Sequence, residues 1–337
     1  MPAELFPQAT PVLSVVVPLF NEEENAPELL RRLVESCRSL GVPFELLVVN
    51  DGSQDNTLPL LVESSRAIPE LRVVDLFRNF GHMPALTAGL ELARGQGIVV
   101  MDGDLQDPPE VIPSLYREWR AGADVVYAQR VRRGEPLFLR LATRLFYALL
   151  RGTTRIHIPK QAGTFCLMDR RVVEILRAMP ERNRFFAGLR AWVGGRQAQV
   201  AYERPRRSHG RSRVGIRGLI RLGLMALVSF SKVPLRYASL LSLACGLILF
   251  LVGSWAIVLR LFTRVTVPGW ATSTALIGMM GFIQSVVLAA ISEYIGQIFD
   301  EVKRRPLYLV REEFARGSAV RPVYSTEPKD SQSILRE

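Results

Sequence analysis

Cysteine, histidine and nucleotide-loop motifs are scarce in this 337-residue chain. It contains 3 cysteines and 3 histidines, and both sets are dispersed, which excludes a disulfide framework and disfavours a zinc or histidine-based metal site. No G-x-G-x-x-G follows the first apolar run and no G-K-[ST] occurs, which disfavours a dinucleotide-binding fold and a P-loop. The first residues carry no basic segment ahead of an apolar core, so we expect no secretory signal and a cytosolic soluble part.

Apolar residues and positive charge are unevenly distributed. The net charge is +11, and the long uncharged runs all follow residue 236, at 237–259 and 272–292. Each run is long enough to cross a bilayer, which takes about 20 residues. A buried hairpin in a soluble core is the alternative, but two such runs in succession disfavour it. Lys and Arg flank the pair on its outer sides more than between the runs, so we expect both termini and the soluble domain in the cytoplasm.

The first 200 residues alternate β-rich runs with helical apolar spacing. We predict strands at 12–18, 44–49, 71–76, 97–101, 123–127 and 197–203, with helices between the first four. This alternation is typical of an α/β protein with a largely parallel sheet and helices on both faces.

Polar loops follow three of these strands, at residues 20–22, 51–53 and 102–104. Each alone is compatible with an ordinary turn, but in a parallel sheet such loops meet at one edge, where ligands bind. Asp102 and Asp104 are one residue apart, so in an extended chain both side chains leave the same face. Two carboxylates there suit Mg²⁺ or Mn²⁺, with a substrate diphosphate completing the coordination.

These motifs and their order resemble family 2 glycosyltransferases of the GT-A fold, in particular the polyprenyl-phosphate glycosyltransferases of the dolichyl-phosphate mannose synthase type, in the bacterial branch with two membrane helices. The matching stretches are 14–23 (SVVVPLFNEE), 49–53 (VNDGS), 78–81 (RNFG), 102–110 (DGDLQDPPE) and 181–194 (ERNRFFAGLRAWVG). The resemblance implies a cytoplasmic GT-A domain over 1–214, an amphipathic interfacial helix over 215–235, a two-helix transmembrane hairpin over 236–300 and a partly disordered cytoplasmic tail over 301–337.

The resemblance also assigns site residues. Nucleotide-sugar binding falls to Pro18, Phe20, Glu22, Asp51, Asp102 and Gly103. The metal falls to Asp102, Asp104 and Gln106. Phosphate binding falls to Arg130, Arg140, Arg207, Ser212 and Arg213. Catalytic roles fall to Asp102, Asp104, Arg130 and Thr164. The arginines after residue 203 also suit a juxtamembrane patch attracted to anionic lipid, and both roles can hold together.

Two residues depart from the resembled pattern. Close bacterial relatives read Gly-Asp-Phe-Arg where this chain has Gly163, Thr164, Phe165 and Cys166. A phosphate-monoester acceptor, with a second pKa of about 6, is already largely dianionic at neutral pH and needs no strong general base. We therefore hypothesise that Thr164 orients the acceptor, or that the site takes a different donor sugar. The Gln-x-x-Arg-Trp motif of processive relatives is absent, which favours single transfer.

The sequence thus predicts a membrane-bound inverting glycosyltransferase. It would move one sugar from a nucleotide sugar, with UDP as the expected nucleotide, to a polyprenyl phosphate such as undecaprenyl phosphate on the cytoplasmic leaflet of the inner membrane. Homo-oligomerisation stays open. The alternatives are a catalytically impaired membrane scaffold of the same fold and, less favoured, a nucleic-acid binder, because the basic loop lacks stacking aromatics.

Overall fold

In the computed structural model the chain forms two compact units. The structure describes residues 10–131, 162–182, 184, 186–203, 242–248 and 269–320, together with six separate positions between 240 and 262. The first unit holds the described residues up to 203 and those from 305 to 320, and the second holds those between 240 and 304. The chain therefore leaves the first unit and later returns to it.

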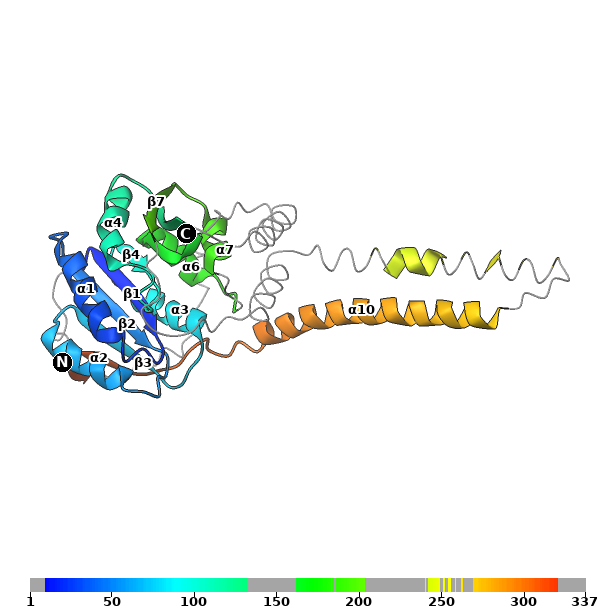
Figure 1. The fold of residues 1–337 in the computed structure, drawn as a ribbon, viewed down its shortest axis with the longest axis horizontal. Coiled ribbons are helices and arrows are strands. Elements are labelled where there is room, and N and C mark those ends of the chain that lie inside the picture. Colours follow the sequence, from blue (N-terminus) through cyan, green and yellow to red (C-terminus); the bar gives the residue numbers. More distant parts are fainter. Residues whose placement is uncertain are drawn as a thin grey trace, which may run out of the picture. The chain divides into compact units, whose positions relative to one another are not determined.

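The first unit is built on a sheet that has nine strands among the described residues, in the order β7-β5-β6-β4-β1-β2-β3-β8-β9 (Figure 1). The strands are β1 (Leu13–Leu19), β2 (Phe44–Asn50), β3 (Leu71–Leu76), β4 (Gly97–Val100), β5 (Val125–Val131), β6 (Ala162–Asp169), β7 (Gln197–Glu203), β8 (Val310–Ala315) and β9 (Ser318–Val320). All six predicted strands are present, within a few residues of their predicted bounds.

The sheet is mixed, so the prediction of a largely parallel sheet is only partly correct. Strands β1 to β4 pair in parallel, and so do β5 and β7. In contrast, β6 runs antiparallel to β4 and β5, while β8 is antiparallel to β3 and β9. The sequence alternation that predicted the parallel core stops before β6, which explains why the antiparallel strands were missed.

Helices cover both faces of the sheet, as predicted. Every residue of β1, β2, β3 and β4 is buried, as expected of strands covered on both sides. The helices of the first unit are α1 (Ala26–Arg38), α2 (Thr57–Ala67), α3 (His82–Leu92), the 3₁₀ turn η1 (Pro109–Val111), α4 (Ile112–Arg120), α6 (Arg170–Ala178) and α7 (Phe186–Val193). Helix α1 buries Leu29, Leu33 and Cys37 at helical spacing against the same core cluster as α2 and α4, whereas α3 packs on the other face and contacts α6.

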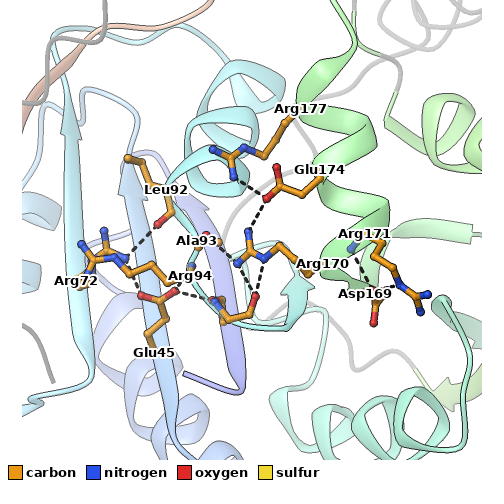
Figure 2. A network of polar contacts seen from close by, with 12 residues as sticks. Glu45, Arg72, Leu92, Ala93, Arg94, Asp169, Arg170, Arg171, Glu174 and Arg177 are labelled. Atoms are coloured by element: carbon orange, nitrogen blue, oxygen red, sulfur yellow. Dashed lines mark hydrogen bonds and ion pairs between the residues drawn. The ribbon is translucent and has the colours of Figure 1, made fainter. Parts of the chain in front are cut away.

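A buried ion-pair triad fastens β8 to the sheet. Arg72 of β3 pairs with Glu45 of β2 (Nη1 to Oε2, 2.6 Å) and with Glu313 of β8 (Nη2 to Oε1, 2.8 Å). Figure 2 shows Arg72 and Glu45 beside the Leu92 carbonyl, which also accepts from Arg72. Residues 310–320 of the segment predicted as a partly disordered tail therefore form two strands of the sheet.

The described part of the second unit is dominated by α10 (Trp270–Val302), a helix of 33 residues. Within it, Leu276–Val302 is the one described stretch long and apolar enough to cross a membrane. The predicted run 272–292 lies inside α10. Of the predicted run 237–259, residues 242–248 and five separate positions are described, and all of them are helical, whereas the predicted interfacial helix lies outside the described residues.

Candidate active site

The loops after β1 and β2 are joined by hydrogen bonds at the carboxyl edge of the sheet. The backbone N–H of Asn21 donates to Ser53 Oγ (3.0 Å), and the N–H of Gln54 donates back to Asn21 Oδ1 (2.8 Å). The N–H of Glu22 donates to Thr57 Oγ1 at the start of α2 (2.9 Å). The predicted convergence of these two strand ends is therefore present in the structure.

Asp51 ties the loop after β3 into the same edge. Its side chain is buried, and its two carboxylate oxygens accept from the backbone N–H groups of Phe80 (2.7 Å) and Gly81 (2.9 Å). Burial raises the pKa of Asp51 above its ordinary value, and these two hydrogen bonds oppose the rise. Gly52 has a φ of +64°, and a Cβ there would collide with the Arg78 backbone, so the close approach of the two loops requires glycine.

The other residues assigned to the nucleotide lie around this edge. Pro18 is buried in β1, and Phe20 and Glu22 are partly exposed just beyond it. Glu22 Oε2 accepts from the Asn25 side chain at 2.6 Å, immediately before α1. The structure thus brings these residues and Asp51 to one edge, while their role in binding a nucleotide stays a prediction.

The acidic loop follows β4, and it is not the extended chain that the sequence argument assumed. Strand β4 ends at Val100, the next residues form a series of bends, and Leu105 has a φ of +57°. The premise that Asp102 and Asp104 share one face of a strand is therefore wrong. The loop instead packs closely against the end of β1. A Cβ on Gly103 would collide with Leu19 and come within 3.3 Å of the Pro18 carbonyl oxygen, so this position requires glycine.

Asp102 lies at the centre of an electrostatic cluster. Its Oδ1 is buried and has no hydrogen-bond partner among the described residues, and the imidazole Nε2 of His82 lies 3.4 Å from it. Burial raises the pKa of the Asp102 carboxyl above its ordinary value, and His82 opposes the rise. The carboxylates of Asp107 and Asp104 add to it. A cation placed at this loop would relieve the repulsion between these acids.

Asp107 connects the acidic loop to Arg130. It is fully buried, and its Oδ1 accepts from the Tyr202 hydroxyl (2.6 Å) and lies 3.4 Å from Arg130 Nη2. Arg130 Nε in turn donates to the Tyr202 oxygen (3.0 Å). Burial alone would lower the pKa of Arg130, but Asp107, Tyr202 and Asp102 together outweigh burial, and the pKa is raised. The predicted phosphate-binding Arg130 therefore lies beside the predicted metal loop as a cation.

The acidic loop partly fits a divalent metal. Among residues the structure describes, no three His, Cys, Asp or Glu side chains converge closely enough to hold an ion by themselves. A magnesium ion commonly takes only one or two carboxylates together with substrate phosphates, and Asp102 Oδ1, which accepts no hydrogen bond from the described residues, is a suitable ligand atom. Asp104 Oδ1 accepts a hydrogen bond from the backbone N–H of Gln106 at 3.2 Å, so Asp104 and Gln106 are adjacent in the folded loop. The ligand set Asp102, Asp104 and Gln106 stays a prediction.

Thr164 lies in β6, at an irregularity. The β5–β6 register moves from Tyr127 opposite Cys166 to Gln129 opposite Ala162, so β6 carries extra residues around Gly163 and Thr164. Such bulges are common beside active sites. The remaining predicted phosphate ligands lie outside the described residues, namely Arg140, Arg207, Ser212 and Arg213.

Sequence reasoning missed several polar residues of this region. His82 directly follows the motif 78–81 and Asp107 lies inside the motif 102–110, so their positions carried a weak signal. Arg190 lies inside the matching stretch 181–194 but was given no role, and Tyr202 and Tyr127 carried no signal, because each meets its neighbours through contacts distant in sequence. Arg190 of α7 is fully buried, donates from Nη2 to the Gly163 carbonyl (3.0 Å) and stacks on Tyr127, with its guanidinium carbon 4.3 Å from the ring centre.

Comparison with known proteins agrees with this architecture. Residues 14–176 match the model of glycosyl transferase family 2. An uncharacterized glycosyltransferase of Synechocystis sp. is 40% identical over 88% of this chain and 94% of its own length. The bactoprenol glucosyl transferase of Shigella phage SfV is 38% identical over 89% of this chain and 98% of its own length.

Solved structures are more distant. Glucosyl-3-phosphoglycerate synthase from Mycobacterium tuberculosis, in complex with UDP, is 22% identical, with a TM-score of 0.43 over 65% of this chain and 79% of that chain. Because this similarity is low, the family assignment depends on the sequence relatives.

Proposed function

The chain belongs to glycosyl transferase family 2, and we propose that it moves a single sugar from a UDP-linked donor to a polyprenyl phosphate, with inversion at the anomeric carbon. The observation that carries the proposal is the juxtaposition of two chemistries at one sheet edge. The acidic loop after β4 suits a metal-bound diphosphate, and Arg130 beside it suits a second phosphate.

On the donor side, Pro18, Phe20, Glu22, Asp51 and Gly103 would hold the nucleotide sugar. Asp102, Asp104 and Gln106 would hold Mg²⁺ or Mn²⁺, which stabilises the negative charge that builds on a departing diphosphate. The buried Asp102 oxygen and the crowded carboxylates around it support this assignment. His82, the first residue of α3, places its Nε2 3.4 Å from Asp102 Oδ1.

On the acceptor side, an oxygen of the lipid phosphate would attack the anomeric carbon opposite the departing diphosphate. The phosphate monoester is largely dianionic at neutral pH, so no strong base is required. Arg130 would hold the phosphate, and Thr164 would orient it. The name of the phage relative supports a polyprenyl acceptor and makes glucose the first sugar to test.

Chain connectivity supports two membrane crossings, and the Lys and Arg residues that flank the pair favour the cytoplasm for the catalytic unit. The segment after α10 returns to the sheet as β8, next to β3. If α10 crosses the bilayer, the chain must cross it an even number of times to return to the same unit, which requires another crossing before α10. The uncharged run 237–259 is the candidate. We therefore retain the proposed domain order of 1–214, 215–235, 236–300 and 301–337, with 310–320 packed into the first domain.

The test is a donor screen with the full chain in detergent, undecaprenyl phosphate and Mg²⁺ or Mn²⁺, followed by mass spectrometry of the lipid. We expect one hexose added to the lipid phosphate from one UDP-sugar, and loss of the product with EDTA. Binding of nucleotide and metal without any lipid product from the whole panel would instead support the scaffold alternative.

A further inference from the structure

Arg190 is a buried cation without a counter-ion in the described part of the chain. It is 0% exposed, its Nε and Nη1 have no hydrogen-bond partner of ordinary geometry among the described residues, and the polar side chains that interact with it, Tyr127 and Cys166, are uncharged. The hydroxyl of Tyr127, beneath the guanidinium, is also buried and has no such partner. Phe186 lies on the guanidinium as well, with the ring centre 5.2 Å from the guanidinium carbon. Hydrogen-bond donors of two side chains therefore gather at one buried place.

Such an arrangement is costly for a protein unless something completes it. A buried charge requires a partner, and buried polar groups are nearly always hydrogen-bonded. The chain meets this requirement elsewhere, because the equally buried Arg72 has a carboxylate on each side. At Arg190 the missing partner is an anion, and guanidinium groups bind phosphate oxygens especially well.

The site lies next to the proposed acceptor phosphate position. Gly163 stands between the two arginines: its carbonyl accepts from Arg190, and a Cβ on it would lie 3.1 Å from Arg130 Nη2. Gly163 lies in the irregular part of β6, and Thr164 is the next residue of the same irregularity. Asp107 partly neutralises Arg130, so Arg190 adds the uncompensated charge.

We propose that Arg190 and Tyr127 form an anion-binding site for a phosphate group, and that this group is the headgroup of the acceptor. The second half of this proposal rests on the proposed function. A donor diphosphate offers the same chemistry, so the experiment must separate the two sources.

The experiment is a calorimetric titration of the full chain in detergent with farnesyl phosphate, with farnesol as the probe lacking phosphate, and with UDP and Mg²⁺. Arg190→Gln should weaken farnesyl phosphate binding about tenfold to a hundredfold, the loss expected for a charged hydrogen bond, and leave UDP binding unchanged. Tyr127→Phe keeps the ring under the guanidinium and should weaken it about fivefold. Arg196→Gln, an exposed arginine just after α7, is the matched control and should change neither.

The outcomes are distinct. Unchanged farnesyl phosphate affinity in both variants, or no phosphate-dependent binding by the wild type, overturns the proposal and leaves Arg190 a structural residue. A loss of UDP affinity instead assigns the site to the donor and overturns the acceptor assignment. Phosphate binding that depends on Arg190 without any lipid product in the donor screen preserves the anion site and refutes the proposed transfer. If Arg190→Gln does not fold, Tyr127→Phe decides.

Discussion

The two halves of the sheet differ in how a buried arginine is neutralised. We call the half around β2, β3 and β8 the closed half, because carboxylates surround its arginine, and the half around β5, β6 and α7 the open half. At β2, β3 and β8, Arg72 is enclosed by Glu45 and Glu313, and although burial alone would lower its pKa, the two carboxylates outweigh burial and raise it. At β5, β6 and α7, Arg190 has no carboxylate partner among the described residues. Both arginines are almost fully buried, so exposure does not distinguish them.

This difference separates a structural joint from a ligand site. The closed triad fixes a strand that returns from the second unit, and nothing is left for a ligand to satisfy. The open half also leaves one oxygen of Asp102 and one of Asp107 without a hydrogen-bond partner in the described structure. Unsatisfied buried groups of both signs, close together, are what a site for a metal and phosphates requires before its ligands bind.

The largest expected effect comes from removing the arginine of the closed half, which leaves its two carboxylates without a cation. Arg72→Met should lower the free energy of unfolding by about 3–5 kcal/mol, because it leaves two glutamates buried without their cation. Thermal unfolding of the full chain in detergent measures the loss. Turnover per folded molecule should not change, since Arg72 belongs to the triad that holds β8 in the sheet and not to the proposed active site.

The control for Arg72→Met is the triple variant that adds Glu45→Gln and Glu313→Gln. Removing all three charges should restore much of the stability, because the penalty comes from the unpaired carboxylates and not from the missing arginine itself. A fall in turnover at unchanged stability would place Arg72 in the functional half and remove the distinction.

The next largest effect should come from the open half. Asp104→Asn removes a proposed metal ligand from a partly exposed loop, so turnover should fall about a hundredfold while the melting temperature stays the same. Initial rates across a Mn²⁺ titration measure the effect, and more metal should recover part of it. Glu63→Gln, which changes an exposed acid on α2 that pairs with Arg66, is the matched control. Equal loss in both variants would show a general charge effect.

The sequence could predict the open half only in part. Continuous apolar runs identified β1 to β4, because strands covered on both faces need nothing but apolar residues. The polar residues after them identified the edge where the loops meet. Local patterning could not predict the bend at Leu105, since the positive φ depends on how the loop packs against β1.

Contacts between distant segments were beyond sequence reasoning in both halves. Tyr202 reaches Asp107 across 95 positions, and Arg72 reaches Glu313 across 241. Neither pair has a spacing that a helix or strand period could indicate. Thr164 and Cys166 were recognised as departures, but only the fold shows that the Arg190 charge opposes the rise in the pKa of Cys166 that burial causes.

The smallest expected effect on stability concerns the contact between Tyr308 and Glu91, and it tests whether this contact is structural, like the Arg72 triad. The Tyr308 hydroxyl, between α10 and β8, donates to Glu91 of α3, and burial together with Glu91 raises the pKa of Tyr308 well above its ordinary value. Tyr308→Phe should cost about 1–2 kcal/mol of unfolding free energy, less than Arg72→Met, because Glu91 is only partly buried and water can replace the hydroxyl.

The cycle with Glu91→Gln separates the Tyr308–Glu91 contact from the packing of the ring. If the bond alone matters, the double variant should be little worse than either single one. Turnover should stay unchanged throughout, since the contact fastens the returning chain and touches no proposed ligand. Should turnover fall more than stability, the return of the chain after α10 would belong to the functional half, and α3, which begins at His82 beside Asp102, would be the element that couples the two.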